Sequence, residues 1–210
     1  MKIIKNPSPN FENRPPSVSV NLLLFHYTGM KSASEAMARL CSPKSKVSAH
    51  YLIDEVGNIF SLVEENKRAW HAGVASWNDD VDINNISVGI EISNPGHEFG
   101  YSRYPERQMI AVEALSIDII KRHSIRAARV LGHSDVSPSR KCDPGELFDW
   151  ERLAAAGIGI WPKISPVSVN FEIGSIRQCQ KQLKMIGYGL KITGGLDELT
   201  RDTILALQRH

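Results

Sequence analysis

The segment from Leu131 to Gly145, which reads LGHSDVSPSRKCDPG, constrains the fold of this chain more than any other stretch. Its two prolines and two glycines forbid a continuous helix or strand, so we expect a shaped loop. The loop carries an imidazole at His133, an ammonium at Lys141 and a carboxylate at Asp143. A nitrogen ligand and an oxygen ligand on one loop would complete a zinc site if a further ligand came from elsewhere in the chain. Such a site would keep one position open for water.

His26 is the predicted third ligand. It lies near the end of an apolar run that we expect to form a buried strand over Val18–Thr28. Two neutral imidazoles and one aspartate would leave a zinc ion with a net positive charge. The pKa of a bound water would then fall from about 15.7 toward about 7. The predicted chemistry is therefore hydrolysis.

A hydrolytic zinc site also needs a general base and a group that stabilises the oxyanion. Glu91 is the predicted base, because it interrupts an otherwise apolar or small-residue strand expected over Ile86–Ser93. Burial raises the pKa of a carboxyl group, which suits proton transfer near neutral pH. Lys141 stands two residues before a ligand and is the predicted oxyanion donor. The alternative for Glu91 is a purely structural ion pair with Lys141.

Four side chains are predicted to contact substrate rather than metal: Tyr27, His50, Trp70 and His71. Trp70 and His71 open a polar, flexible stretch that runs to Asn85, and such loops commonly carry binding residues. His50 has apolar neighbours, so a hydrogen-bonded core histidine is the alternative. His123 is expected to have a structural role at a helix end, and we assign no role to His97 or His210. Cys142 should point away from the site, because both of its neighbours face it.

The remaining pattern indicates an α/β layer architecture, with strands alternating with helices. We expect a helix over 34–40 with Ser34 as its cap, and a hairpin over 48–63 that turns at Gly57. A core-facing helix should run from Pro105 to His123, and a short strand over 129–131 should lead into the His133 loop.

Composition narrows the class of protein further. The net charge is only +2 and the basic residues are scattered, so nucleic acid is not an expected partner. No apolar run approaches the length of a membrane span, which needs about 18 residues. The N-terminus lacks the hydrophobic centre of a secretory signal. The three cysteines, Cys41, Cys142 and Cys179, include no close pair, so we expect no disulfide framework.

The sequence predicts four segments. Residues 1–16 form an extended strap, 17–162 the catalytic domain, 163–174 a linker after a Gly- and Pro-rich stretch, and 175–210 a small all-α module. In this module Ile176, Cys179, Leu183 and Ile186 should share one helix face. Asp197 should cap a second helix with Leu199 or Thr200, Ile204 and Leu207 facing inward.

The 132–145 segment resembles the signature loop of the type 2 family of zinc-dependent N-acetylmuramoyl-L-alanine amidases, which is related to the peptidoglycan recognition proteins. Four more blocks resemble that family in the same order: Phe25–Thr28, Val47–Ile53, Ala69–Gly73 and Val88–Ile92. Together the five blocks span roughly residues 16–162. The tail is similar to the small helical peptidoglycan-binding module often joined to these amidases.

The resemblance implies a central mixed β-sheet flanked by helices. It implies one zinc ion bound by His26, His133 and Asp143, with Glu91 and Lys141 as catalytic partners. The substrate would be peptidoglycan or muropeptides, including anhydro forms, cut between the lactyl group of N-acetylmuramic acid and L-alanine. The tail favours the bacterial cell envelope, periplasm or outer membrane, whereas the absence of a leader favours the cytoplasm. A non-catalytic peptidoglycan receptor and a zinc peptidase acting on the stem peptide are the alternatives.

Overall fold

The structure is a computed structural model that describes residues 1–162 and 174–210. Its centre is a six-stranded sheet in the order β1-β5-β4-β7-β3-β8. The strands are β1 (Ile3–Lys5), β3 (Leu22–Tyr27), β4 (Tyr51–Ile53), β5 (Ile59–Ser61), β7 (Ser87–Ile92) and β8 (Val130–Gly132). All neighbours run parallel except the β4–β5 hairpin, so the predicted mixed sheet is confirmed.

The two longest strands, β3 and β7, place alternate side chains on the two faces of the sheet. Leu23 and Phe25 face one core cluster, while Leu22 and Leu24 face another. His26 follows on the second face and lies directly opposite Glu91 of β7 in the parallel register. The strand pattern therefore brings the predicted base beside a predicted metal ligand.

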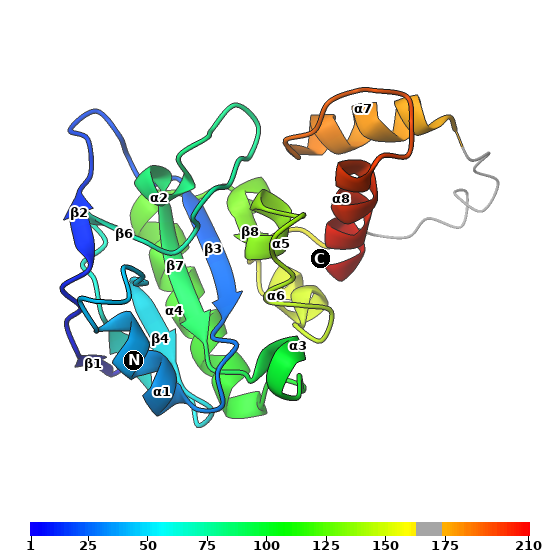
Figure 1. Ribbon diagram of the computed structural model, residues 1–210. Helices are drawn as coiled ribbons and strands as arrows, with labels where there is room; N and C mark the ends of the chain where they lie inside the picture. The colour runs from blue at the N-terminus through cyan, green and yellow to red at the C-terminus, as the bar shows by residue number, and fades with distance from the viewer. Residues whose placement is uncertain (163–173) are drawn as a thin grey trace.

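Helices cover both faces of the sheet (Figure 1). The long helix α4 (Glu106–His123) packs Met109, Val112, Leu115 and Ile119 against one face, as predicted, together with α6 (Trp150–Ala155). The opposite face carries α1 (Ala33–Leu40) and α5 (His133–Val136). The short helices α2 (Ile83–Ile86), α3 (Gly96–Phe99) and η1 (Ala127–Arg129) complete the layers.

Two local predictions need correction. The cap of α1 is Ser32, whose side chain accepts a hydrogen bond from the Glu35 backbone, and the helix already includes the predicted cap Ser34. The stretch from Trp70 to Asn85 is polar in composition but well packed, because Ala72, Trp77 and Ile83 are buried in it. These apolar anchors are sufficient to order a segment that is otherwise largely polar.

The N-terminal segment is attached to the rest of the fold by two short strands. β1 forms the edge of the main sheet, and β2 (Phe11–Asn13) pairs with β6 (Lys67–Ala69) in a second, two-stranded sheet. Between them the buried Asn10 donates hydrogen bonds to the Val47 and Ser42 carbonyls, both at 2.8 Å.

The C-terminal region contains α7 (Ile176–Ile186) and α8 (Glu198–Arg209), and Asp197 caps α8 as predicted. Of the predicted inward positions of α8, Thr200 is buried and Leu199 and Ile204 are partly buried against the core, but Leu207 is 41% exposed. Thr203 and Ala206 are buried instead. Ile186 of α7 is also exposed. The small side chains of Thr200, Thr203 and Ala206 lie three positions apart and allow α8 to pack closely. Leu207 follows Ala206 by one position and therefore points away from this face. Most of the predicted linker, 163–174, lies outside the described residues.

The two C-terminal helices share a hydrophobic cluster with the sheet. Leu183, Tyr188, Leu190 and Ala206 belong to the same cluster as Leu22 and Leu24 of β3. In Figure 1 α8 lies beside α5, and α7 lies across the other side of α8. Within the described ranges, no helix combines the length and the apolar character needed to span a bilayer.

Candidate active site

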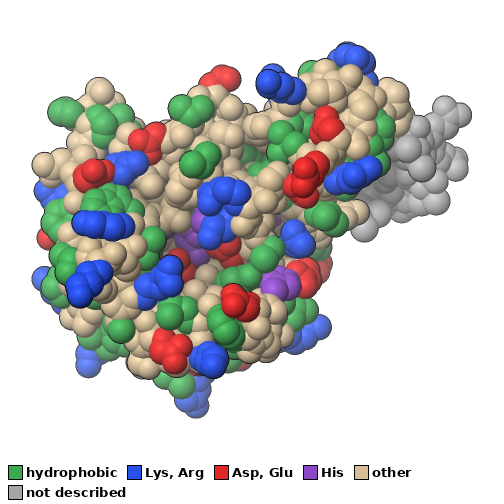
Figure 2. Space-filling view, viewed as in Figure 1, with side chains coloured by type: hydrophobic (Ala, Val, Ile, Leu, Met, Phe, Trp, Pro, Cys, Tyr) green, Lys and Arg blue, Asp and Glu red, His purple; other side chains and the backbone are tan. Residues whose placement is uncertain are grey.

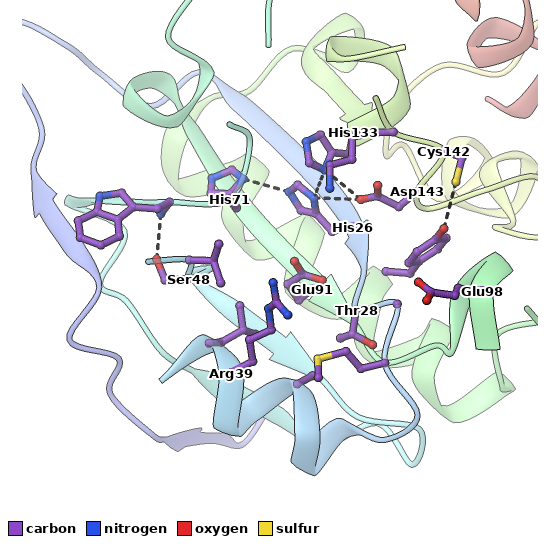
Figure 3. A pocket seen from close by; sticks show the side chains of 18 of the residues that line it. His26, Thr28, Arg39, Ser48, His71, Glu91, Glu98, His133, Cys142 and Asp143 are labelled. Atoms are coloured by element: carbon purple, nitrogen blue, oxygen red, sulfur yellow. Dashed lines mark hydrogen bonds and ion pairs between the residues drawn. The ribbon is translucent and has the colours of Figure 1, made fainter. Parts of the chain in front are cut away.

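Three predicted ligands meet at one point. The Nδ1 atoms of His26 and His133 are 2.9 Å apart, and each lies 3.1 Å from Oδ2 of Asp143. All three side chains are buried. Figure 3 shows them converging at the end of β3. His133 and Asp143 lie 107 and 117 positions after His26 in the chain, yet the three side chains form a single cluster, as the sequence predicted.

The strand register explains why these side chains meet. Phe25 of β3 pairs with Gly132 of β8, so His26 and His133 each follow a paired residue on adjacent strands. The loop then folds back, and the Ser134 backbone donates a hydrogen bond to the Asp143 carbonyl at 2.9 Å. This contact brings Asp143 to the two imidazoles.

The donor set fits a divalent transition metal. A tetrahedral site with bonds of about 2.0–2.1 Å separates its ligand atoms by about 3.3 Å, close to the spacing of these three atoms. The outer nitrogen of each imidazole already has a partner: His133 Nε2 lies 2.9 Å from the Ala72 carbonyl, and His26 Nε2 lies 3.0 Å from His71 Nδ1. Such contacts direct the Nδ1 lone pairs toward a shared centre.

The protonation properties of the cluster are those of metal ligands. Burial, reinforced by the nearby His133, lowers the pKa of His26 to about 4, so its imidazole is neutral at pH 7. For Asp143 burial would raise the pKa, but His133 and His26 together hold it well below its usual range. A neutral imidazole, as at His26, and an ionised carboxylate, as at Asp143, are the ligand forms that bind a metal ion.

Glu91 lies beside this cluster, between it and Arg39 (Figure 3). Burial, and secondarily the negative charge of Asp143, raises the pKa of Glu91 well above its usual value. Its Oε2 atom is buried and has no hydrogen-bond partner among the described residues. A carboxylate with a raised pKa and a free oxygen is suited to take a proton from a group inside the cavity.

The cluster opens into a cavity of about 450 Å³. Its lining includes the three ligands, Glu91, Lys141, Tyr27, Trp70 and His71. Figure 2 shows histidine side chains in a hollow of this face, with Lys and Arg side chains around it. The ion pairs among residues 1–162 and 174–210 include none between Lys141 and Glu91, so the structural alternative for Glu91 is not what the structure shows.

The four predicted substrate contacts differ in their access to the cavity. Tyr27 and Trp70 line it, and the Tyr27 hydroxyl lies 3.1 Å from Cys142 Sγ. The prediction that Cys142 points away is wrong, because Cys142 also lines the cavity. His71 also lines it, but both of its ring nitrogens have protein partners. His50 is fully buried away from the lining, and its Nδ1 accepts a hydrogen bond from the Gly89 backbone at 2.9 Å. His50 is therefore a hydrogen-bonded core histidine, the alternative that its apolar neighbours indicated.

Sequence reasoning missed two residues near the site. Arg39 lines the cavity from α1, but a single exposed arginine in a short helix carries no recognisable pattern. Asp135 is fully buried and accepts hydrogen bonds from the Gly132 backbone, the Tyr188 hydroxyl and His210 Nδ1, each at 2.7 Å. Its partners come from distant segments, and His210 was given no role.

The fold and the site define a class: an α/β protein with a candidate metal centre and a buried acidic group in one cavity, the arrangement of a metal-dependent hydrolase. The model of the N-acetylmuramoyl-L-alanine amidase family matches residues 15–146. The chain belongs to this family.

Individual relatives agree with this assignment. Over 167 residues the chain is 32% identical to the 1,6-anhydro-N-acetylmuramyl-L-alanine amidase AmpD of Haemophilus influenzae, covering 71% of this chain and 89% of AmpD. It is 35% identical over 161 residues to the N-acetylmuramoyl-L-alanine amidase AmiD of Escherichia coli, covering 71% of this chain but only 57% of AmiD.

Solved structures extend the likeness to the tail. The structure of E. coli AmiD with the substrate anhydro-N-acetylmuramic acid-L-Ala-D-gamma-Glu-L-Lys superposes with a TM-score of 0.81 at 30% identity, covering 94% of this chain and 83% of that one. AmpDh3 of Pseudomonas aeruginosa, in complex with anhydromuramic pentapeptide, gives a TM-score of 0.76 at 28% identity, covering 89% and 90%.

Proposed function

We propose that this protein is a zinc-dependent N-acetylmuramoyl-L-alanine amidase that cleaves the amide between the lactyl group of N-acetylmuramic acid and L-alanine. The observation that carries the proposal is the convergence of His26, His133 and Asp143 beside Glu91 in one cavity, in a chain of this family. Zinc is favoured over harder cations because two of the three ligands are imidazoles.

The chain's own groups would perform the proton transfers. A zinc ion held by the three ligands would polarise the scissile carbonyl and acidify the attacking water. Glu91 takes a proton from that water as it attacks and delivers it to the departing alanine nitrogen, so a carboxylate and a free amine are formed. Lys141, on the cavity wall, donates to the oxyanion that develops on the carbonyl.

The proposed substrates are muropeptides, including those with 1,6-anhydro-N-acetylmuramic acid. Support comes from AmiD and AmpDh3, whose complexes hold an anhydromuramyl tripeptide and an anhydromuramic pentapeptide. The cavity volume of about 450 Å³ is in the range of small-ligand sites, about 300–1,000 Å³. Tyr27 and Trp70 are the proposed aromatic contacts.

We also propose that the segment after residue 174 is a peptidoglycan-binding module and that the protein acts in the bacterial envelope. The module would bind the enzyme to the wall polymer and raise its local concentration there. This effect requires intact cell wall, which is present in the envelope. Pull-down of the protein with purified insoluble peptidoglycan tests the first point. Immunodetection in fractionated cells of the source bacterium tests the second.

Products separate the proposed amidase from its two alternatives. The protein is incubated with anhydromuramyl tetrapeptide and, separately, with the free tetrapeptide, and products are identified by mass spectrometry. An amidase releases intact tetrapeptide and the anhydromuramyl sugar from the first and leaves the second unchanged. Cleavage within the free peptide would identify a peptidase, and binding without turnover a receptor. Dialysis against a chelator should abolish the activity and added zinc should restore it.

A further inference from the structure

Beyond the five residues assigned above, we infer that His71 and Ser87 are positioning residues that fix the tautomer and the ring orientation of His26. The inference rests on the proposed metal site, because it concerns how that site holds one of its ligands. Neither residue belongs to the predicted metal or catalytic set. His71 was predicted from the sequence to touch substrate, and Ser87 was not singled out.

A chain of short polar contacts leads from the ligand to the backbone. His26 Nε2 lies 3.0 Å from His71 Nδ1, and His71 Nε2 lies 3.2 Å from Ser87 Oγ. The Ser87 hydroxyl donates to the Ile83 carbonyl at 2.6 Å. His26, His71 and Ser87 are all buried. Solvent therefore does not compete for these groups, and each depends on its protein partner.

The chemistry of the two ends gives this chain one direction. The Ile83 carbonyl only accepts, so the Ser87 hydroxyl must donate to it and its oxygen is left to accept from His71 Nε2–H. A neutral His71 then has a lone pair on Nδ1, which accepts from His26 Nε2–H. The second nitrogen of His26 consequently carries a lone pair on Nδ1, the atom that faces His133 and Asp143.

The sheet is shaped to hold the His71 ring. Ser87, Gly89 and Glu91 alternate along the site face of β7, and a Cβ at Gly89 would lie 2.5 Å from His71 Nδ1. The glycine thus leaves room for the ring between the serine that binds it and the predicted catalytic glutamate. A small residue is required at position 89 of this alternating strand, because a larger side chain would collide with the His71 ring.

The backbone around His71 is fixed from the other side. The buried Asn84 side chain accepts hydrogen bonds from the His71 and Ala72 amides at 3.1 and 2.9 Å. The Ala72 carbonyl in turn lies 2.9 Å from Nε2 of His133. Two consecutive residues therefore supply the partners of both ligand imidazoles, one through a side chain and one through a carbonyl.

The test measures zinc affinity, by competition with a chromogenic chelator, in the full chain. His71→Leu removes the acceptor for His26 and should weaken zinc binding about 10–100-fold, the usual effect of losing a partner of a ligand histidine. His71→Asn places an amide oxygen near the position of Nδ1 and should recover most of that loss. Ser87→Ala should weaken binding by a smaller factor.

A matched control and a double variant make the outcome decisive. Ser116 is a buried serine in α4 whose hydroxyl has no partner among the described residues, so Ser116→Ala should leave zinc affinity unchanged. Because Ser87 acts through His71, adding Ser87→Ala to His71→Leu should cause no further loss. Circular dichroism of the zinc-free variants checks that each is folded.

Three results would overturn the inference. None of them would contradict the proposed function, provided that the wild-type protein binds zinc. One is wild-type affinity in folded His71→Leu, and another is equal losses in His71→Asn and His71→Leu. The third is a raised KM for muropeptide with unchanged zinc affinity, which would make His71 a substrate contact. If the wild-type protein itself bound no zinc, the proposed function would fail instead.

Discussion

Glu91 and Asp143 are carboxylates in the same cavity whose pKa values are shifted in opposite directions. Burial raises the pKa of Glu91, whereas the two neighbouring imidazoles hold that of Asp143 below its usual range. Pairs of acids separated in this way commonly divide their roles, one remaining ionised and the other exchanging protons. Here the proposed roles are metal ligand for Asp143 and general base for Glu91.

The first prediction concerns Glu91→Gln, which keeps the shape of the side chain and removes its basicity. We expect kcat on anhydromuramyl tetrapeptide to fall about 10²–10⁴-fold, the usual contribution of a general base. Zinc content by atomic absorption should stay near one per chain, because Glu91 is not in the ligand cluster. His133→Ala is the contrasting variant and should lose the metal. Wild-type turnover by Glu91→Gln would refute the role of the base.

The second prediction is the acid limb of the pH profile. A base acts only when ionised, so activity falls as the pH drops through its pKa. Because burial raises the pKa of Glu91 above the ordinary 4.5, kcat/KM should begin to fall at a pH above that value. Rates measured from pH 4 to 8 at saturating zinc give the limb. The same limb should be missing from the residual activity of Glu91→Gln, and its persistence there would assign the limb to another group.

At the scale of elements, periodicity predicted the central strands and α4, because their burial follows local sequence. The alternation in β7 placed Glu91 on the site face, and the register with β3 then brought it opposite His26. The same reasoning failed at one position of α8, where Leu207 is exposed and Thr203 and Ala206 are buried instead. Helix faces with small residues pack closest, but the sequence does not show which partner they will meet.

The turn after β5 gives a prediction about stability. Burial alone would raise the pKa of Glu65, but hydrogen bonds from Arg122, Tyr51 and His123 bring it down to about 2. These contacts join the turn to β4 and to the end of α4, and they include the structural role expected of His123.

A carboxylate with a lowered pKa stabilises the folded state above its unfolded pKa, and this stabilisation disappears as the pH falls through the folded value. Glu65→Gln should therefore lower the free energy of unfolding at pH 7 by about 1–2 kcal/mol, allowing for the solvent around Arg122. The difference from wild type should shrink between pH 4.5 and 2. Urea titrations measure it, with the exposed neighbour Glu64→Gln as control. A pH-independent difference would contradict the assignment.

At the scale of the whole molecule, the short helix α5 connects the candidate metal cluster with the C-terminal helices. α5 begins with His133 and contains Asp135, whose carboxylate binds Tyr188 and His210 from the tail. The His210 ring also stacks on Trp150 with centroids 3.8 Å apart. The sequence showed the 131–145 loop and the tail as separate units, because Tyr188 and His210 lie 53 and 75 positions after Asp135 in the chain.

This shared core predicts how the chain unfolds. If the tail were an independent module, thermal or urea unfolding would show two transitions; a common core with β3 favours a single cooperative one. Tyr188→Phe leaves the buried Asp135 with one donor fewer and should lower the free energy of that single transition by about 1–3 kcal/mol.

Met185→Ala, at an 85% exposed position of α7, should change it by less than about 0.5 kcal/mol. In the wild type and in each variant, the unfolding curve from tryptophan fluorescence should coincide with the curve from far-UV circular dichroism. A separate early transition in Tyr188→Phe would show that the tail detaches before the catalytic fold melts, and that α5 does not couple them.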